Sequence, residues 1–194
     1  MPKLPEEVLE DRRMQIIGAA RRVFAAKGLS KVTLRDVFRE TGLSAGAVYN
    51  YFKSKDDLIL AVTQAGMTEA LSALEQPGGD GAERLDQLID AFFGSLTAGA
   101  GREAPRVDLM IAAEALGNEA VLSAVVKHRA QIRDALVRVI EQGQAKGQLS
   151  TKHAAATLAE LLYAAFQGLI VSRALGEDAN AAAVGDALKK LLRD

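Results

Sequence analysis

Apolar residues recur at intervals of three and four along almost all of the 194-residue chain. This spacing puts them on one face of an α-helix, whereas a half-buried strand would alternate apolar and polar residues. Glycines and the four prolines fall mostly between these segments, where turns are expected. The polar first ten residues are expected to form a loose arm. The pattern predicts an all-α fold, with helices over residues 11–27, 34–41, 45–52, 54–74, 82–96, 107–116, 119–146, 151–175 and 181–192.

Residues 31–57 read as two short helices joined by a tight turn, followed by the start of a third. Thr33 is a favourable N-cap, and Asp36 three residues later completes a pair resembling a capping box. Gly42 can take the left-handed conformation that ends a helix. Ser44 then caps the second helix. The turn is therefore only three residues long, which is typical of a helix-turn-helix.

The second short helix is too polar and too small to be core. Ala45, Gly46 and Asn50 leave its leading face nearly bare, so its free N–H groups can come close to a phosphate backbone. Tyr49 and Tyr51 add hydroxyl groups, which commonly reach phosphates. The alternative is an ordinary three-helix core, but such a core has no need for two exposed tyrosines beside a bare helix start.

The segment 33–58 resembles the DNA-binding motif of the tetracycline-repressor (TetR) family. Phe38 departs from the family pattern, which usually has a small residue there, and is expected to repack the core of the motif without abolishing binding. The resemblance covers residues 11–60, and the rest of the chain is similar only in length and helical plan. The positions that match are Thr33, Val37, Gly42, Leu43, Ser44, Gly46, Val48, Tyr49, Tyr51, Phe52, Ser54, Lys55 and Leu58.

The resemblance implies a helix-turn-helix DNA-binding domain over residues 1–53 and a helical ligand-binding and dimerisation domain over residues 54–194. Residues 1–60 carry 11 Lys and Arg against 8 Asp and Glu, and residues 61–194 carry 13 against 17. The excess is +3 in the first segment and −4 in the second. A mildly basic head on an acidic body agrees with a head that meets nucleic acid.

The expected function is that of a homodimeric regulator of transcription. Repression is expected because it is the more common activity in the family that this chain resembles. One helix-turn-helix reads few bases, whereas a two-fold dimer reads a near-palindromic operator with half-sites one or more turns of ~34–36 Å apart. Ala45, Gly46 and Asn50 are expected to face base edges. The phosphate contacts are expected from Lys31, Thr33, Ser44, Tyr49, Tyr51 and Lys55.

Residues 151–175 are apolar on almost every side, so this helix must be covered on every side. Together with the last helix it is expected to form a four-helix bundle with a second copy, as TetR-family proteins usually do. A membrane span is the competing interpretation, but Glu160, Gln167 and the high alanine content argue against it. The expected interface residues are Leu158, Leu162, Phe166, Leu169, Leu188 and Leu191.

The family resemblance also implies a small-molecule pocket in the body, whose mostly apolar lining favours an apolar or amphipathic effector. Binding would favour a conformation that releases DNA. His128 lies on an apolar helix face. Three roles are open for it: a buried histidine bonded to a neighbour, a polar group in the pocket, or a metal ligand. The candidates, each of which has plain core as the alternative interpretation, are Met67, Leu71, Phe92, Phe93, Leu96, Met110, His128, Tyr163 and Gln167.

Enzymatic chemistry finds no support in the sequence. There is no cysteine, no G-x-S-x-G elbow, no P-loop and no cluster of metal-ligand spacing. Residues 99–104 fit the loose dinucleotide pattern G-x-G-x-x-A, yet no strand precedes them. Asp86 and Asp90 are expected to form a solvated face. We therefore expect no catalytic residues, metal or cofactor, and a cytoplasmic location because no secretory signal is present. The remaining alternative is a helical interaction module without sequence-specific DNA binding.

Overall fold

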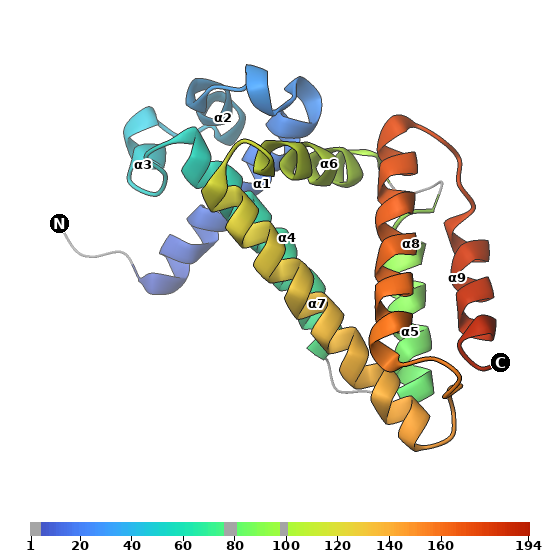
Figure 1. The fold of residues 1–194 in the computed structure, drawn as a ribbon. Helices are drawn as coiled ribbons and strands as arrows, with labels where there is room; N and C mark the ends of the chain where they lie inside the picture. The colour runs from blue at the N-terminus through green and yellow to red at the C-terminus, as the bar shows by residue number, and fades with distance from the viewer. Residues whose placement is uncertain (1–4, 76–80, 98–100) are drawn as a thin grey trace. The chain divides into compact units, whose positions relative to one another are not determined.

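The computed structural model describes residues 5–75, 81–97 and 101–194, and every regular element in these ranges is a helix (Figure 1). The all-α prediction is confirmed for this part of the chain. Residues 1–4, 76–80 and 98–100 lie outside the described residues. They hold part of the expected arm, a segment between two predicted helices, and part of the dinucleotide-like pattern. The elements are α1 Glu6–Lys27, the 3-10 turn η1 Leu29–Lys31, α2 Leu34–Thr41, α3 Ala45–Tyr49, α4 Lys55–Glu75, α5 Gly81–Gly94, α6 Glu103–Ala115, α7 Glu119–Ala145, α8 Ala155–Leu175 and α9 Ala181–Leu191.

The chain forms two compact units. The first contains Met1–Gly66 and Val107–Val125, and the second contains Met67–Arg106 and Val126–Asp194. Helices α4, α6 and α7 therefore contribute residues to both units. The sequence analysis expected one domain boundary after residue 53, whereas these units exchange segments at three places. The expected domain boundary stays a prediction.

The first unit is built around the apolar stripe of α1. Ile16, Ala20 and Phe24, spaced by four residues, are completely buried, as the helical periodicity predicts. Val37 of α2 and Val48 of α3 are also inaccessible to solvent and pack into the same core. The three N-terminal helices therefore share one hydrophobic centre.

Side-chain caps fix where the helices of this unit begin. The Asp36 backbone N–H donates to Thr33 Oγ1 at 3.4 Å, and the Thr33 N–H donates to Asp36 Oδ2 at 3.0 Å, so the expected capping box is confirmed. Lys27 Nζ also donates to Asp36 Oδ1 at 2.6 Å. The Lys27 bond, followed by the bonds from Thr33, holds the pKa of Asp36 well below its usual range.

A second box of the same kind starts α4. The Asp57 N–H donates to Ser54 Oγ at 3.0 Å, and the Ser54 N–H donates back to Asp57 Oδ2 at 3.0 Å. The Lys53 N–H also donates to Asp57 Oδ2, at 2.8 Å. The Lys53 bond is the main reason why the pKa of Asp57 is lowered, although partial burial opposes the shift.

Two helices begin earlier than the sequence predicts. Helix α1 begins at Glu6, not at residue 11, and the expected loose arm is wrong over residues 6–10. Glu6 and Glu7 lie in its first turn, where acidic side chains stabilise the helix dipole. Helix α6 begins at Glu103, not at residue 107. Pro105 falls in its first turn, where a missing N–H costs no helical hydrogen bond.

Helix α8 begins later than predicted, at Ala155 and not at residue 151. The side-chain amide of Gln144 donates to the carbonyl oxygens of Ser150 at 2.8 Å and His153 at 2.9 Å. Because these carbonyl groups bind a side chain, the segment before Ala155 stays in a loop.

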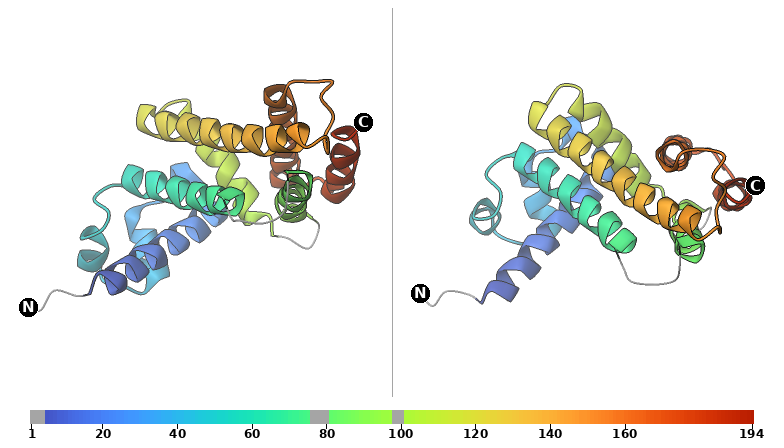
Figure 2. Two further views of the ribbon diagram at one scale, coloured as in Figure 1. Left: turned by 90° about the horizontal axis from the view of Figure 1, so that it is seen from below. Right: turned by 60° about the horizontal axis from the view of Figure 1, so that its bottom comes forward.

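In the second unit α5, α8 and α9 run alongside one another (Figure 2). Their apolar faces, with one face of α7, enclose a core centred on Leu85, Ile140, Ala159 and Leu162. Among the described residues α8 is the one helix long and apolar enough to cross a membrane, and 39% of its most apolar stretch is buried inside the chain. The core of the second unit therefore covers one of the apolar sides of α8.

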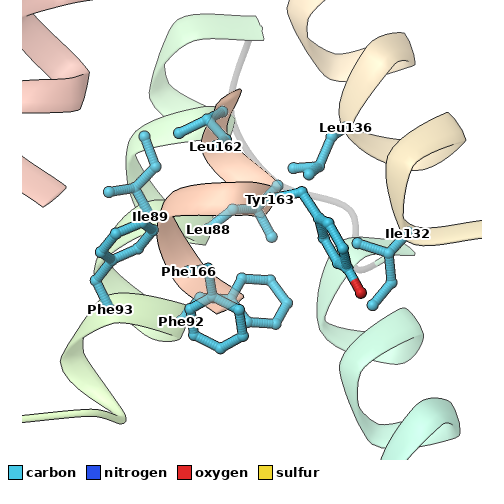
Figure 3. A pocket seen from close by; sticks show the side chains of 9 residues that line it. All are labelled: Leu88, Ile89, Phe92, Phe93, Ile132, Leu136, Leu162, Tyr163 and Phe166. Carbon is cyan, nitrogen blue, oxygen red and sulfur yellow. The ribbon is translucent and has the colours of Figure 1, made fainter. Parts of the chain in front are cut away.

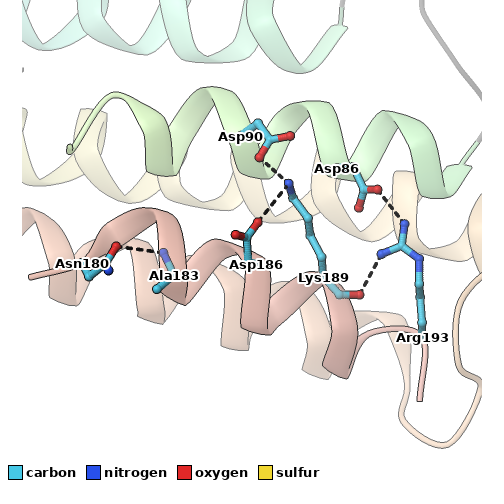
Figure 4. A network of polar contacts seen from close by, with 7 residues as sticks. All are labelled: Asp86, Asp90, Asn180, Ala183, Asp186, Lys189 and Arg193. Carbon is cyan, nitrogen blue, oxygen red and sulfur yellow. Dashed lines mark hydrogen bonds and ion pairs between the residues drawn. The ribbon is translucent and has the colours of Figure 1, made fainter.

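Ion pairs join the outer faces of α5 and α9 (Figure 4). Arg193 donates to Asp86 at 2.6 Å, and Lys189 lies against Asp90 and 3.6 Å from Asp186. Burial opposes the charge of Lys189, but these carboxylates outweigh it and raise its pKa. Asp86 and Asp90 therefore anchor α9, a role that the sequence alone did not reveal because the partners lie about a hundred residues away.

Candidate functional site

The turn between α2 and α3 has the local chemistry that the sequence predicts. Gly42 takes a left-handed conformation with φ of 69°, which a residue without Cβ adopts at little cost. The Thr41 hydroxyl donates to the Phe38 carbonyl at 2.9 Å and accepts from the Leu43 N–H at 3.2 Å. Ser44 Oγ then accepts from the Ala47 N–H at 3.2 Å and caps α3. The helix-turn-helix is confirmed.

The leading face of α3 is exposed, as expected. Ser44, Ala45, Gly46, Tyr49 and Asn50 all lie open to solvent. A Cβ added at Gly46 would meet no heavy atom within 4 Å. Since nothing in the first unit fills this space, the face can approach a second molecule closely. Val48 on the opposite side is completely buried and holds α3 to the core.

The expected phosphate-binding side chains differ in their surroundings. Lys31 and Thr33 are exposed just before α2, and the Thr33 hydroxyl donates to Asp36 Oδ2 at 2.8 Å. Tyr51 is half-buried against the core of the first unit. Lys55 is half-buried at the first position of α4. Their roles toward DNA stay predictions.

Two arginines beside α3 were not among the expected contacts. Arg35 and Arg39, one turn apart on α2, are both exposed and line an open hollow together with Phe38 and Tyr49. The Phe38 ring meets the Tyr49 ring edge to face, with centroids 5.2 Å apart. Phe38, the departure from the family pattern, thus supports Tyr49. The spacing of four between the arginines is visible in the sequence, but their nearness to α3 depends on the fold.

The second unit contains a small cavity of about 40 Å³, shown in Figure 3. It is lined by side chains of α5, α7 and α8, and its surface is entirely apolar, since Tyr163 contributes its ring and not its hydroxyl. This volume is only slightly larger than the share of one molecule in liquid water, and far below the ~300 Å³ at which ligand pockets begin. The lining residues are Leu88, Ile89, Phe92, Phe93, Ile132, Leu136, Leu162, Tyr163 and Phe166.

The polar groups near the cavity gather around Tyr163. The Gln167 amide donates to the Tyr163 hydroxyl at 2.5 Å, and the Arg133 guanidinium carbon lies 5.9 Å from the centroid of the Tyr163 ring. Burial raises the pKa of Tyr163, and the charges of Arg129 and Arg133 partly oppose that shift.

His128 lies one helical turn before the cavity-lining Ile132 on α7. Its Nδ1 atom is buried and has no hydrogen-bond partner among the described residues. Burial, and secondarily the charge of Arg129, lowers the pKa of His128, so the ring is neutral at neutral pH. Which of the three roles expected for His128 applies stays a prediction. Where the structure describes the chain, no three His, Cys, Asp or Glu side chains gather as a metal site would require.

Among the other expected pocket residues, the structure brings only Phe92, Phe93 and Tyr163 to the cavity wall. Leu71 packs on the core of the second unit, Leu96 joins a small separate cluster, and Met110 belongs to the first unit. The Met67 side chain lies outside what the structure describes. Six wall residues were missed, namely Leu88, Ile89, Ile132, Leu136, Leu162 and Phe166.

The expected dimer residues are mostly turned toward the core. Leu158, Leu162 and Leu188 are at most 7% exposed, and Phe166 and Leu169 are half-buried against the core. Leu191 alone of the six is strongly exposed, at 62%. The exposed apolar side of α8 carries other residues, at intervals of four and three: Thr157, Leu161, Ala164, Gly168, Val171 and Leu175.

Comparison with known proteins decides the family. The family described as "Bacterial regulatory proteins, tetR family" matches residues 16–62. The family described as "BetI-type transcriptional repressor, C-terminal" matches residues 81–194, more than half of the chain. The chain belongs to the TetR family of transcriptional regulators. TetR-family proteins are DNA-binding regulators of transcription and not enzymes, so the first unit of this TetR-family chain carries its DNA-binding motif.

Among curated relatives, the chain is 32% identical to the regulator YfiR of Bacillus subtilis over 98 residues, which are 50% of this chain and 47% of YfiR. This match therefore spans less than half of YfiR. The chain is 29% identical to the regulator BetI of Brucella anthropi over 195 aligned residues, covering 97% of this chain and 93% of BetI.

Solved structures of transcriptional regulators share the fold over nearly the whole chain. A putative regulator from Saccharomonospora viridis in complex with choline has a TM-score of 0.77 at 23% identity and covers 95% of each chain. FadR of Bacillus subtilis in complex with stearoyl-CoA has a TM-score of 0.77 at 19% identity, covering 93% of this chain and 97% of FadR. At these identities the likeness concerns the fold alone.

Proposed function

We propose that this TetR-family regulator is a cytoplasmic, homodimeric repressor that leaves a near-palindromic operator when a small molecule opens the cavity of the second unit. The observation that carries the proposal is the bare, exposed face of α3, where even an added Cβ at Gly46 would touch nothing. Such a face suits close contact with base edges, and the α3 N-terminus suits phosphate.

In the proposed complex Ala45, Gly46 and Asn50 face base edges. An asparagine can pair with adenine, and an alanine can meet a thymine methyl group. The backbone phosphates are held by groups that set the register of the protein on DNA. These are Lys31, Thr33, Ser44, Tyr49, Tyr51 and Lys55, to which the exposed positions of Arg35 and Arg39 add two further candidates.

The proposed dimer interface is the exposed apolar side of α8 and α9. Leu161, Val171 and Leu175 are 49%, 40% and 68% exposed on α8, and Leu191 is 62% exposed on α9. A Cβ at Gly168, between Leu161 and Val171, would meet nothing within 4 Å, so two copies of α8 can approach closely here. Complete burial of a fully exposed large apolar side chain stabilises by about 1.5–3 kcal/mol, so these partly exposed side chains would contribute roughly half of that each.

The proposed effector site is the cavity between α5, α7 and α8. Two relatives with this fold were solved with choline and with stearoyl-CoA, which supports a ligand-responsive role for the helical body. The cavity of this chain is too small for either molecule as it stands. Ligand binding must therefore enlarge it, and a ligand that favours the enlarged form shifts the population toward that form.

The proposal is tested by selecting binding sites from a random duplex library with the full-length protein, followed by mobility shifts at several salt concentrations. We expect a near-palindromic site, one dimer bound per site, and an affinity that falls steeply with salt because phosphate contacts release counterions. Failure to enrich any sequence would instead favour a helical interaction module.

Dimerisation is tested separately by sedimentation. Replacing Leu161 and Leu191 with lysine places charges on the proposed interface, so the double variant should sediment as a monomer and lose the operator shift. Val126→Lys is the matched control, because Val126 is 54% exposed on α7 of the same unit. An unchanged dimer in the double variant would place the interface elsewhere.

A further inference from the structure

The cavity of the second unit is apolar throughout, but its two sides have unlike surroundings, and this asymmetry constrains the ligand of an enlarged cavity. Figure 3 shows Phe92, Phe93 and Phe166 gathered at one end, and the Tyr163 oxygen on the side of Ile132. Phe166 meets Phe92 edge to face, with ring centroids 5.4 Å apart, and lies 5.8 Å from Phe93. This end offers hydrocarbon contact only.

Hydrogen-bond donors lie beside Tyr163, outside the apolar surface of the cavity, where an enlarged cavity would reach them. Gln167 donates an amide proton to the Tyr163 oxygen, which leaves the hydroxyl proton of Tyr163 available. The neutral His128 ring lies one turn beyond Ile132, with a buried nitrogen that lacks a partner among the described residues. These groups can satisfy a ligand that brings acceptors.

The charges at this end are mainly positive. Within the described part of the chain, the charges that influence the Tyr163 hydroxyl are those of Arg129, Arg133 and Glu160. Arg133 lies over the Tyr163 ring and reaches Glu160 at 3.5 Å, with the Glu160 side chain 60% exposed. One carboxylate thus faces two guanidinium groups, so the end of the cavity keeps an excess positive charge.

We propose that the ligand of this cavity is an amphipathic anion, an organic acid whose apolar body enters between Phe92, Phe93 and Phe166 and whose carboxylate lies toward Tyr163 and Arg133. This inference rests on the proposed role of the cavity as the effector site. A carboxylate supplies the acceptors that the donors lack, and an Arg–carboxylate pair is a strong, geometrically matched contact.

A quaternary ammonium ligand does not fit this arrangement. Aromatic ring faces attract a cation, but no acidic side chain lines the described cavity wall to balance its charge. Arg129 and Arg133 would repel a cation on the Tyr163 side. The sign of the ligand's charge is therefore set by these two residues of α7.

The test compares three compounds that share a ten-carbon tail: decanoate, decanol and decyltrimethylammonium. Each is titrated by calorimetry, below its micelle concentration, into the full-length protein without DNA. We expect decanoate to bind most tightly and decyltrimethylammonium least. The comparison uses the unaltered protein, so its outcome does not depend on whether any variant folds.

Substitution then locates the anion. Arg133→Gln should weaken decanoate about tenfold, because a hydrogen bond to a charged group contributes about 1.5 kcal/mol, and should leave decanol unchanged. Arg133→Lys should restore part of the affinity. Arg138→Gln removes an exposed arginine of the same helix and should alter neither compound.

Equal or tighter binding of the ammonium compound, absence of decanoate binding, or full decanoate affinity in Arg133→Gln would each overturn the inference. Mobility shifts on the same preparations separate it from the proposed function. Specific DNA binding without decanoate binding refutes only the anion site, whereas decanoate binding without DNA binding refutes only the repressor.

Discussion

The hydroxyl group of Tyr49 provides a direct test of the proposed DNA surface, because it can be removed without removing the ring. Tyr49 is 43% exposed, and its ring meets Phe38 edge to face at 5.2 Å. The structure gives the hydroxyl no part in the core of the first unit. Tyr49→Phe should therefore leave the free energy of unfolding within about 0.5 kcal/mol of the original.

Binding to DNA should respond differently. A hydrogen bond to a charged phosphate contributes about 1.5 kcal/mol, which corresponds to about a tenfold change in affinity. Two copies of Tyr49 act in the proposed dimer, so Tyr49→Phe should weaken operator binding by about 100-fold. Tyr49→Ala should bind no better and should in addition lose about 0.5–1.5 kcal/mol of stability, since it removes the aromatic pair with Phe38.

The assay is fluorescence anisotropy with a labelled operator over a series of salt concentrations, alongside unfolding by denaturant. Tyr49→Phe removes no charge, so its slope of log affinity against log salt should equal that of the original. Lys55→Gln should reduce that slope by about 0.9 per protomer, while Lys146→Gln, an exposed lysine of the other unit, should not. Unchanged affinity in Tyr49→Phe would refute the phosphate contact.

Three further predictions concern the fold around these sites. Gly46→Gln should leave stability unchanged, because a side chain there meets nothing within 4 Å, yet abolish the operator shift, whereas Gly94→Gln, equally unobstructed, should bind normally. Gly81→Ala should destabilise by about 1–3 kcal/mol on denaturant unfolding, because its Cβ would lie 2.3 Å from the Gly143 nitrogen. Acidification should lower the melting temperature, because the pKa values of Asp36 and Asp57 are depressed in the folded state. The stability that these carboxylates contribute is full above their unfolded pKa of ~3.9 and is lost as pH falls through their folded values. Alanine at both positions should make the melting temperature less sensitive to low pH.

The helix-turn-helix was predictable from sequence because its determinants are local. Thr33 and Asp36 lie three residues apart and form their capping box without help from distant segments. Gly42 and Ser44 set the turn in the same way. An interaction confined to one turn of helix leaves a fixed spacing in the chain, and that spacing is what sequence analysis can recognise.

The cavity was only partly predictable because its wall joins segments far apart in the chain. Leu88 of α5, Ile132 of α7 and Leu162 of α8 meet there, and each looks like any other core residue at helical spacing. Nothing local distinguishes a leucine that borders a cavity from one that fills a core. The aromatic residues Phe92, Phe93 and Tyr163 were anticipated because large or polar side chains stand out in an apolar helix.

The proposed dimer face was even less predictable from the sequence than the cavity wall. A helix with one polar side has its rotation fixed by that side, but α8 is apolar nearly all round. Leu158 and Leu161 are therefore equivalent in the sequence, and only packing shows that Leu158 is 7% exposed and Leu161 49%. The sequence argument that α8 needs cover on more than one side stays a prediction. Its own core covers the side of Leu158, and the exposed heptad-like row that includes Leu161 and Val171 is the side that a second copy would cover.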